Sequence, residues 1–260
     1  MRIALSQMAF TPTAISQSFE EMEKWATEAS IANANLVTFP ELFICGYLNA
    51  VSARELSLTA AELAGNLSSI ARRHRIAICA GYSERDGETL YNSAMLVDRD
   101  GIWRLNYRKM HLWGSLEKLL FSPGEPSAVV QIQPACSVGV LICYDLDIPA
   151  ATQDLQRRGA DMALVISATG KDYSVVPRMQ VPVRAYENSV CVAFCNRVGG
   201  GFAGESAVAA PDGSFLARGS AAEEELVLAD LKIGDWHHYR SGHRYVDDQR
   251  VDYFPLRPLT

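Results

Sequence analysis

The chain has 260 residues, of which 48% are hydrophobic and 21% are charged, and 24 basic against 30 acidic residues give a formal net charge of −6. This composition excludes a disordered or fibrous chain, and a protein of this length buries enough surface to fold without disulfides or a structural metal. A mildly acidic chain is also a poor candidate for nucleic-acid binding, because phosphate neutralisation needs a basic face.

The start of the chain carries no mark of export. It opens with the strand-like segment Ile3-Ala4-Leu5, without the basic start, long apolar stretch and cleavage site of a signal peptide. No apolar run reaches the roughly eighteen residues that span a bilayer. We therefore expect a soluble, cytoplasmic protein that does not bind membranes.

Short apolar, β-rich runs recur along the whole chain and predict strands. They cover residues 3–8, 36–39, 76–82, 92–97, 102–107, 129–132, 138–143, 162–167, 190–195, 206–210, 215–217 and 226–231. Asp-Gly turns begin at positions 86, 100 and 212, and the last two are typical of hairpins.

Between the strands, apolar residues at helical spacing predict helices. The first follows Ser16, a candidate N-cap, and the second begins near Ser52. Two more are expected at residues 149–158 and 175–188, where Pro182 should bend or shorten the last one.

No linker, low-complexity tract or charge block marks a domain boundary. We interpret residues 1–260 as one α/β domain with helices on its outer faces and an extended C-terminal tail from about residue 246. Residues 251–259 are apolar and proline-rich but too few to form a core. We expect this tail to lie across a partner subunit.

Most of the six cysteines are expected to be buried core thiols, since nothing suggests an oxidising compartment. Cys191 and Cys195 fall on one face of an apolar run with period two. His237, His238 and His243 cluster near the C-terminus without an acidic or cysteine partner at metal-ligand spacing. A solvated helix or loop is therefore favoured there over a zinc site.

Cys143 stands at the end of a predicted strand and before a helix start. Asp145, Asp147 and Pro149 are all residues that begin helices. The strand–turn–helix pattern is similar to a nucleophile elbow, in which a side chain lies beside free backbone N–H groups and the helix N-terminus favours the thiolate. Judged on this segment alone, a buried core cysteine is the simpler interpretation.

A cysteine nucleophile needs a base, and the sequence offers two. His111 stands in a Lys-Met-His-Leu segment, whereas Glu41 follows a buried strand and Pro40 among apolar neighbours. A carboxylate in such a place either caps a backbone group or has a raised pKa. Lys109, flanked by aromatic and apolar residues, is a candidate cation; the alternative is an edge-strand lysine whose stem packs against the rings.

Together these segments resemble the nitrilase, or carbon–nitrogen hydrolase, superfamily. That family carries a Glu-Lys-Cys triad in this chain order, within Pro-Glu, Lys-x-His-Leu and Cys-Tyr-Asp segments that match Glu41, Lys109 and Cys143. Its second glutamate, ahead of Phe-x-x-Gly, matches Glu117. The segments 184–188 and 196–199 also look like the family, so the resemblance spans residues 1 to about 231.

The resemblance implies a four-layer α-β-β-α sandwich that forms homodimers or larger homo-oligomers through helices on one outer face. It implies neither a metal nor an organic cofactor. Many members continue after Cys-Tyr-Asp with Arg or Glu, an aromatic residue, Pro and Glu. This chain reads Leu146-Asp147-Ile148-Pro149-Ala150, so the helix loses its first-turn glutamate. Asp147 is expected to keep part of the interaction with the helix dipole. Pro182 is also unusual for the family.

By the same resemblance, Glu41 takes the thiol proton as Cys143 attacks a carbonyl carbon, and then passes a proton to the departing nitrogen. Lys109 and the backbone N–H of Tyr144 would hold the oxyanion.

Two neighbouring residues take supporting roles in this interpretation. Glu117 would orient Lys109 or help to position the substrate. His111 is expected to be structural, because Glu41 already acts as the base.

Tyr144 and Asp145 favour one branch of the family, because Cys-Tyr-Asp is commoner among amidases and Cys-Trp-Glu among true nitrilases. We expect an amidase that hydrolyses a small carboxamide to a carboxylate and ammonia through a thioester on Cys143. The alternatives, in order, are an N-carbamoyl amidohydrolase, a true nitrilase and a non-catalytic homologue that uses the fold for assembly.

Overall fold

The structure is a computed structural model that describes residues 1–47, 50–134 and 136–250. Its first sheet contains β1 (Arg2–Gln7), β2 (Leu36–Thr38), β3 (Ala77–Asp86), β4 (Thr89–Val97), β5 (Trp103–Arg108) and β14 (Glu225–Asp230). Its second sheet contains β6 (Val129–Gln133), β7 (Cys136–Ile142), β8 (Met162–Ile166), β9 (Cys191–Cys195), β12 (Ala207–Ala209) and β13 (Phe215–Arg218). A separate two-stranded ribbon is formed by β10 (Val198–Gly199) and β11 (Phe202–Ala203).

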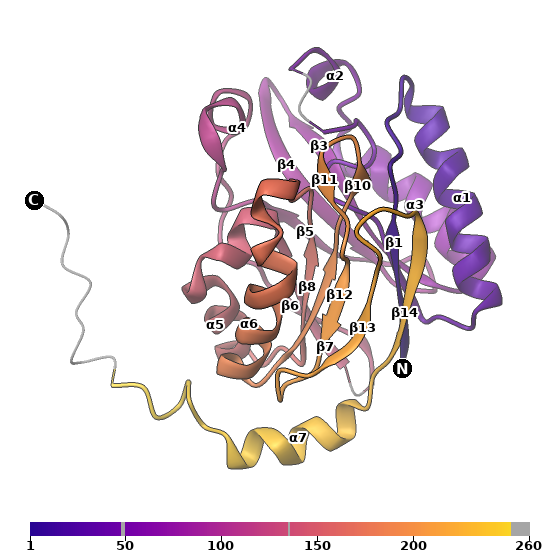
Figure 1. Ribbon diagram of the computed structural model, residues 1–260. Helices are drawn as coiled ribbons and strands as arrows, with labels where there is room; N and C mark the ends of the chain where they lie inside the picture. Colours follow the sequence, from indigo (N-terminus) through magenta and orange to yellow (C-terminus); the bar gives the residue numbers. More distant parts are fainter. Residues whose placement is uncertain (48–49, 135, 251–260) are drawn as a thin grey trace, which may run out of the picture.

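The α-helices are α1 (Ile15–Ile31), α2 (Ala50–Glu55), α3 (Ala60–His74), α4 (Gly114–Leu120), α5 (Pro149–Arg157), α6 (Val181–Asn188) and α7 (Ile233–Gly242). Helices α1 and α3 pack on the outer face of the first sheet, and α5 and α6 on that of the second (Figure 1). The two sheets lie between these helix pairs, so the predicted α-β-β-α sandwich is confirmed.

Each sheet has parallel strands in its middle and antiparallel strands at its sides. The orders are β14-β1-β2-β3-β4-β5 and β13-β12-β9-β8-β7-β6. The pairs β1–β2, β2–β3, β7–β8 and β8–β9 are parallel. Strands covered on both faces need apolar residues at every position, which explains the uninterrupted burial of β2, β8 and β9.

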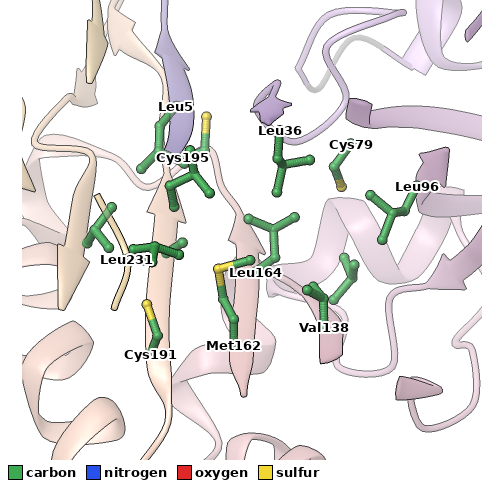
Figure 2. Close-up of a cluster of buried hydrophobic side chains, with 14 of the residues drawn as sticks. Leu5, Leu36, Cys79, Leu96, Val138, Met162, Leu164, Cys191, Cys195 and Leu231 are labelled. Atoms are coloured by element: carbon green, nitrogen blue, oxygen red, sulfur yellow. The ribbon is translucent and has the colours of Figure 1, made fainter. Parts of the chain in front are cut away.

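The main core lies between the two sheets. Figure 2 shows Leu36 and Leu96 of the first sheet facing Val138 and Leu164 of the second. Cys191 and Cys195 both point into this core, as their spacing predicts, because alternate residues of a strand share a face.

The helix boundaries correct two sequence predictions. Helix α1 begins at Ile15 with Ala14 as its N-cap and no side-chain cap, so Ser16 is not the cap. The helix expected from near Ser52 is two helices, because Thr59 and Glu62 form a capping box that starts α3 anew.

The predicted helix 149–158 is confirmed as α5, but residues 175–188 do not form one α-helix. A π-helical stretch, Val176–Gln180, precedes α6, and Pro182 lies in the first turn of α6. Proline is tolerated there because a first-turn N–H has no partner within the helix. The predicted shortening is therefore confirmed.

The sequence patterns did not predict α4 or the β10–β11 ribbon, and α7 is the helix of the helix-or-loop alternative left open around His237. All of the tail segment 251–259 lies outside the described residues. In the part of the chain that the structure describes, no helix is both long and apolar enough to cross a membrane.

Candidate active site

The chain turns sharply where β7 ends. Cys143 follows Ile142 with a φ of 48°, in the left-handed region that a residue with a Cβ seldom adopts, and opens the 3₁₀ helix Cys143–Asp147. Asp145 fixes this turn, since its Oδ2 accepts hydrogen bonds from Ile142 N at 3.0 Å and from Tyr107 Oη at 2.8 Å. The surrounding contacts thus hold Cys143 in a strained conformation.

Asp145 also joins this turn to the segment that follows β5. Its Oδ1 accepts a hydrogen bond from His111 N at 2.9 Å and lies 2.9 Å from His111 Nδ1. In the described structure the His111 ring therefore contacts Asp145, and this contact connects the segment after β5 to the turn after β7.

Glu41 lies in the turn that follows β2 and is fully buried. Arg197 holds this turn, because its Nε donates to Glu41 O at 3.2 Å and its Nη2 donates to Leu42 O at 3.2 Å. Gly81 on β3 makes room for the turn, since a Cβ there would clash with Leu42 N and Pro40 O. Two distant segments therefore fix the position of Glu41.

The two carboxylate oxygens of Glu41 have different surroundings. Oε1 accepts hydrogen bonds from Lys109 Nζ at 2.7 Å and from Asn92 Nδ2 at 2.8 Å. Oε2 is buried and has no hydrogen-bond partner among the described residues. A buried acceptor without a partner is unusual, and it leaves one oxygen available for a proton.

Lys109 follows β5, is fully buried, and bridges two glutamates. In addition to its contact with Glu41, its Nζ lies 2.9 Å from both carboxylate oxygens of Glu117, a buried residue of α4. Glu117 is held in turn by Trp113 N, which donates to its Oε2 at 2.8 Å, and by Tyr47 Oη at 3.4 Å. The site therefore holds one ammonium group between two carboxylates.

The charges of the site keep Lys109 protonated. Burial lowers the pKa of the Lys109 ammonium, but Glu41, Cys143 and Glu117 together raise it by more than burial lowers it. The resulting pKa lies above the ordinary value for lysine. The pKa of the Glu117 carboxyl is raised, first by burial and then by Glu41, against the opposing effect of Lys109. Lys109 thus acts as a fixed positive charge.

The pKa of the Cys143 thiol reflects more than the helix start that favours its thiolate. Burial, followed by the charge of Glu41, raises the pKa of Cys143 from 9.0 to about 12, although Lys109 and hydrogen bonds from Ser167 and Ala168 lower it. The desolvation of the thiolate and the nearby carboxylate outweigh the helix N-terminus. The resting thiol is therefore neutral and needs a base.

Cys143 and Tyr144 lie on the wall of a cavity of about 360 Å³. Most of that wall is apolar or aromatic, and its polar side chains include Thr169, Asp147 and Gln180. The cavity is lined by Tyr47, Trp113, Cys143, Tyr144, Asp147, Ala168, Thr169, Gly170, Tyr173, Val175, Val176, Gln180 and Phe202.

Three polar residues contact the site although the sequence analysis assigned them no role. Asn92 orients Glu41, and the only hint in the sequence is an amide residue just before the apolar run that ends strand β4. Thr169 Oγ1 lies 3.8 Å from Cys143 Sγ, and Asn196 Oδ1 accepts from Thr169 N at 2.8 Å. Asn196 belongs to the 196–199 segment that resembles the family, but its partner is visible only in the fold.

His237 and His243 make their contacts away from this cavity. His237 Nε2 is 3.0 Å from Asp161 Oδ1, and the His243 ring stacks on Tyr239 with centroids 3.9 Å apart. Among the described residues, no group of three or more His, Cys, Asp or Glu side chains is placed to hold a metal ion.

Comparison with known proteins gives a family match across most of the chain. The model of the carbon-nitrogen hydrolase family matches residues 2–241. The chain is 34% identical to the Pseudomonas protegens protein named "hydrolase in pqqF 5′ region", over 98% of this chain and 90% of that protein. It is 32% identical to an (R)-stereoselective amidase of a Pseudomonas species, over 84% of this chain and 81% of that protein.

The same similarity appears in three dimensions. An amidase from a Nesterenkonia species superposes with a TM-score of 0.86 at 31% sequence identity, covering 97% of this chain and 94% of that chain. In another structure of that amidase, the acetamide moiety of fluoroacetamide is covalently added at the active-site cysteine.

Proposed function

The chain belongs to the carbon–nitrogen hydrolase family, and on that premise we propose that it is an amidase that converts a small carboxamide to a carboxylate and ammonia. Glu41, Lys109 and Cys143 are the proposed triad, with Glu117 in support. The observation that carries the proposal is the carboxylate of Glu41, whose Oε1 is held by Lys109 while its buried Oε2 is unpartnered.

The first step is acylation of Cys143. Glu41 takes the thiol proton as Sγ forms a bond to the carbonyl carbon of the amide, whose π electrons move to oxygen. A base is needed because the pKa of Cys143 is about 12 and the free thiolate is scarce at neutral pH. Glu41 then gives the proton to the amide nitrogen, the C–N bond breaks, and ammonia leaves a thioester on Cys143.

The oxyanion of the tetrahedral intermediate requires positive charge and hydrogen-bond donors. Lys109 supplies a charge that stays fixed, because Glu41 and Glu117 hold its ammonium group in place. The backbone N–H of Tyr144 lies in the first turn of the 3₁₀ helix Cys143–Asp147, where N–H groups have no partner within the helix. These donors stabilise the transition state more than the neutral carbonyl, which raises kcat.

Deacylation repeats the chemistry with water. Glu41 removes a proton from a water molecule as its oxygen attacks the thioester carbon. The second tetrahedral intermediate collapses, the C–S bond breaks, and the proton returns from Glu41 to Cys143. The carboxylic acid leaves and ionises, so the enzyme regains its starting state.

Ammonia release from a panel of substrates tests the proposal. The panel contains simple aliphatic amides, N-carbamoyl amines and nitriles, and intact-protein mass spectrometry with a slow amide follows the acyl adduct. We expect amides to be hydrolysed fastest and the adduct mass to fall on Cys143. Turnover of carbamoyl compounds or nitriles in preference to amides would replace the proposal with one of those activities, and an absence of turnover on all three would overturn it.

A further inference from the structure

Asp147 places a carboxylate on the wall of the cavity that holds Cys143. The two residues stand at opposite ends of one 3₁₀ helix, Cys143–Asp147, whose rise of about 2 Å per residue separates their Cα atoms by roughly 8 Å. Ile148 is the N-cap of helix α5 and no side chain caps this helix, so the Asp147 carboxylate makes no capping hydrogen bond there. A substrate bonded to Cys143 can therefore extend toward Asp147.

The Asp147 carboxylate forms no salt bridge in the described structure. Among the described residues, no Lys, Arg or His nitrogen lies within salt-bridge distance of it. Arg184 is nearby, but its hydrogen bonds go to the backbone oxygens of Leu146 at 2.9 Å and of Asp147 at 3.1 Å, and to Glu187 at 2.9 Å. Burial raises the pKa of the Asp147 carboxyl, although Gln180, Arg184 and Lys109 lower it. A partly buried carboxylate of this kind gains from a cationic ligand.

The rest of the cavity also suits a positive charge. No Lys, Arg or His is among its described lining residues, and the nearby Lys109 is already shared by two glutamates. Among the lining residues, Trp113 and Tyr173 meet edge to face at 5.8 Å. Tyr47 meets Phe202 in the same way at 5.5 Å, but the Arg197 guanidinium already lies over the Phe202 ring, so Trp113, Tyr173 and Tyr47 are the rings left for a ligand. Aromatic faces attract ammonium groups, and a carboxylate adds a charged acceptor.

On this geometry, and resting on the amidase activity proposed above, we propose that the substrates are small carboxamides that carry a protonated amine. Asp147 binds the ammonium group while the aromatic residues surround it and the carboxamide lies at Cys143. Asp147 is thus a specificity-determining residue. Uncharged amides of the same shape bind less well, and amides that carry a carboxylate are excluded by repulsion from Asp147.

The test compares amides that differ only in charge. 3-Aminopropanamide has the shape of butyramide with an ammonium group in place of the terminal methyl, and succinamate carries a carboxylate. Longer pairs, 4-aminobutanamide with pentanamide and 5-aminopentanamide with hexanamide, vary the reach toward Asp147. A charge-assisted hydrogen bond is worth about 1.5–3 kcal/mol, so kcat/KM should favour the amino-amide of the best-fitting pair by about tenfold or more, with succinamate slowest.

Two variants identify the source of that preference. Asp147→Asn keeps the size of the side chain and removes its charge, so the ratio of kcat/KM within the pair should fall about tenfold. Asp172→Asn removes an exposed charge from a residue outside the cavity lining, and the ratio should stay at its wild-type value.

The outcomes separate this inference from the proposed function. If wild-type enzyme hydrolyses the neutral amides and shows no preference for the amino-amides, the inference fails while the amidase assignment stands. An unchanged ratio in Asp147→Asn would also overturn it. Failure to hydrolyse any amide would instead overturn the proposed function. The wild-type comparison decides the matter even if Asp147→Asn does not fold.

Discussion

Lys109 holds together two carboxylates that would otherwise repel each other in a fully buried site. We expect Lys109→Met to lower kcat by at least 10²–10³-fold, because the oxyanion loses a charged donor. The variant should also lose about 3–5 kcal/mol of unfolding free energy, since Glu41 and Glu117 are left buried and unpaired. Single-turnover acylation and urea unfolding measure the two effects.

A second substitution separates these effects. In Lys109→Met with Glu117→Gln the local charge returns to its wild-type value, so stability should recover in part while acylation stays slow. Lys109→Arg keeps the charge but changes its shape and should also be poor. Near-normal acylation by Lys109→Met would show that Lys109 does not hold the oxyanion.

Cys143 is the half-exposed member of a set of six free thiols whose other members are buried. We expect Cys143→Ala to abolish turnover with the fold intact, and iodoacetamide to modify Cys143 alone in the native protein. Because burial raises the pKa of Cys143 to about 12, the rate of modification should keep rising with pH up to pH 10 without a plateau. Peptide mapping and circular dichroism check the site and the fold; retained turnover in Cys143→Ala would contradict the triad.

At the level of elements, the site depends on loops that approach one another through backbone atoms. Gly124 donates its N–H to Lys109 O at 2.9 Å, and a Cβ at this position would clash with the backbone carbonyl of Arg108. Gly124→Ala should therefore displace the segment that carries Lys109 and lower both kcat and stability.

The matched control is another glycine with free space around it. A Cβ on Gly65 of α3 meets no atom within 4 Å, so Gly65→Ala should raise stability by about 0.5–1 kcal/mol and leave kcat unchanged. Steady-state kinetics and urea melts of both variants make the comparison. Equal kcat in Gly124→Ala and wild type would show that this close approach does not position Lys109.

Across the whole molecule, the thiols between and around the sheets make stability sensitive to alkali. Burial raises the pKa of Cys79 and of Cys136 from 9.0 to about 12, and those of Cys191 and Cys195 are also raised. Since each pKa is higher in the folded chain, the thiols favour the folded state fully below about pH 9. That contribution is lost as the pH rises through the folded-state values.

We therefore expect the unfolding free energy under reducing conditions to fall steeply above pH 9. Each thiol that ionises only in the unfolded chain contributes about 1.36 kcal/mol per pH unit. Cys79→Val removes one such thiol and should lessen the slope by up to that amount. Urea melts at pH 7.5, 9 and 10 measure it; equal slopes for variant and wild type would contradict the prediction.

The second outer layer presents apolar side chains that suit an interface. Met179, Val183 and Tyr186, on or just before α6, are 61%, 47% and 44% exposed. We expect a homodimer or larger homo-oligomer that Val183→Glu shifts toward the monomer, as judged by light scattering on dilution. Ile31→Glu, at the end of α1 on the opposite outer layer, should leave the mass unchanged. A monomeric wild-type protein would contradict the prediction.

The sequence patterns by themselves determined the α/β class and the residues at the strand ends, and the family resemblance implied the four layers. Strand patterns depend on the alternation of side chains along one segment, and motifs such as Cys143-Tyr144-Asp145 are contiguous, so both can be found without the fold. The same local information predicted the turn between β7 and α5 and the shortening of α6 at Pro182, because both depend on backbone geometry within a few residues.

Only the tertiary structure decided how the site is tuned. Three features of the site depend on segments that are far apart in the chain. They are the contact of Asn92 with Glu41, the hydrogen bonds of Arg197 to the turn after β2, and the burial of the unpartnered Glu41 Oε2. The pKa of Cys143 also depends on burial and on the charge of Glu41, and together these outweigh the helix start that favours the thiolate. Desolvation and through-space charge belong to the packed fold and leave no pattern along the sequence.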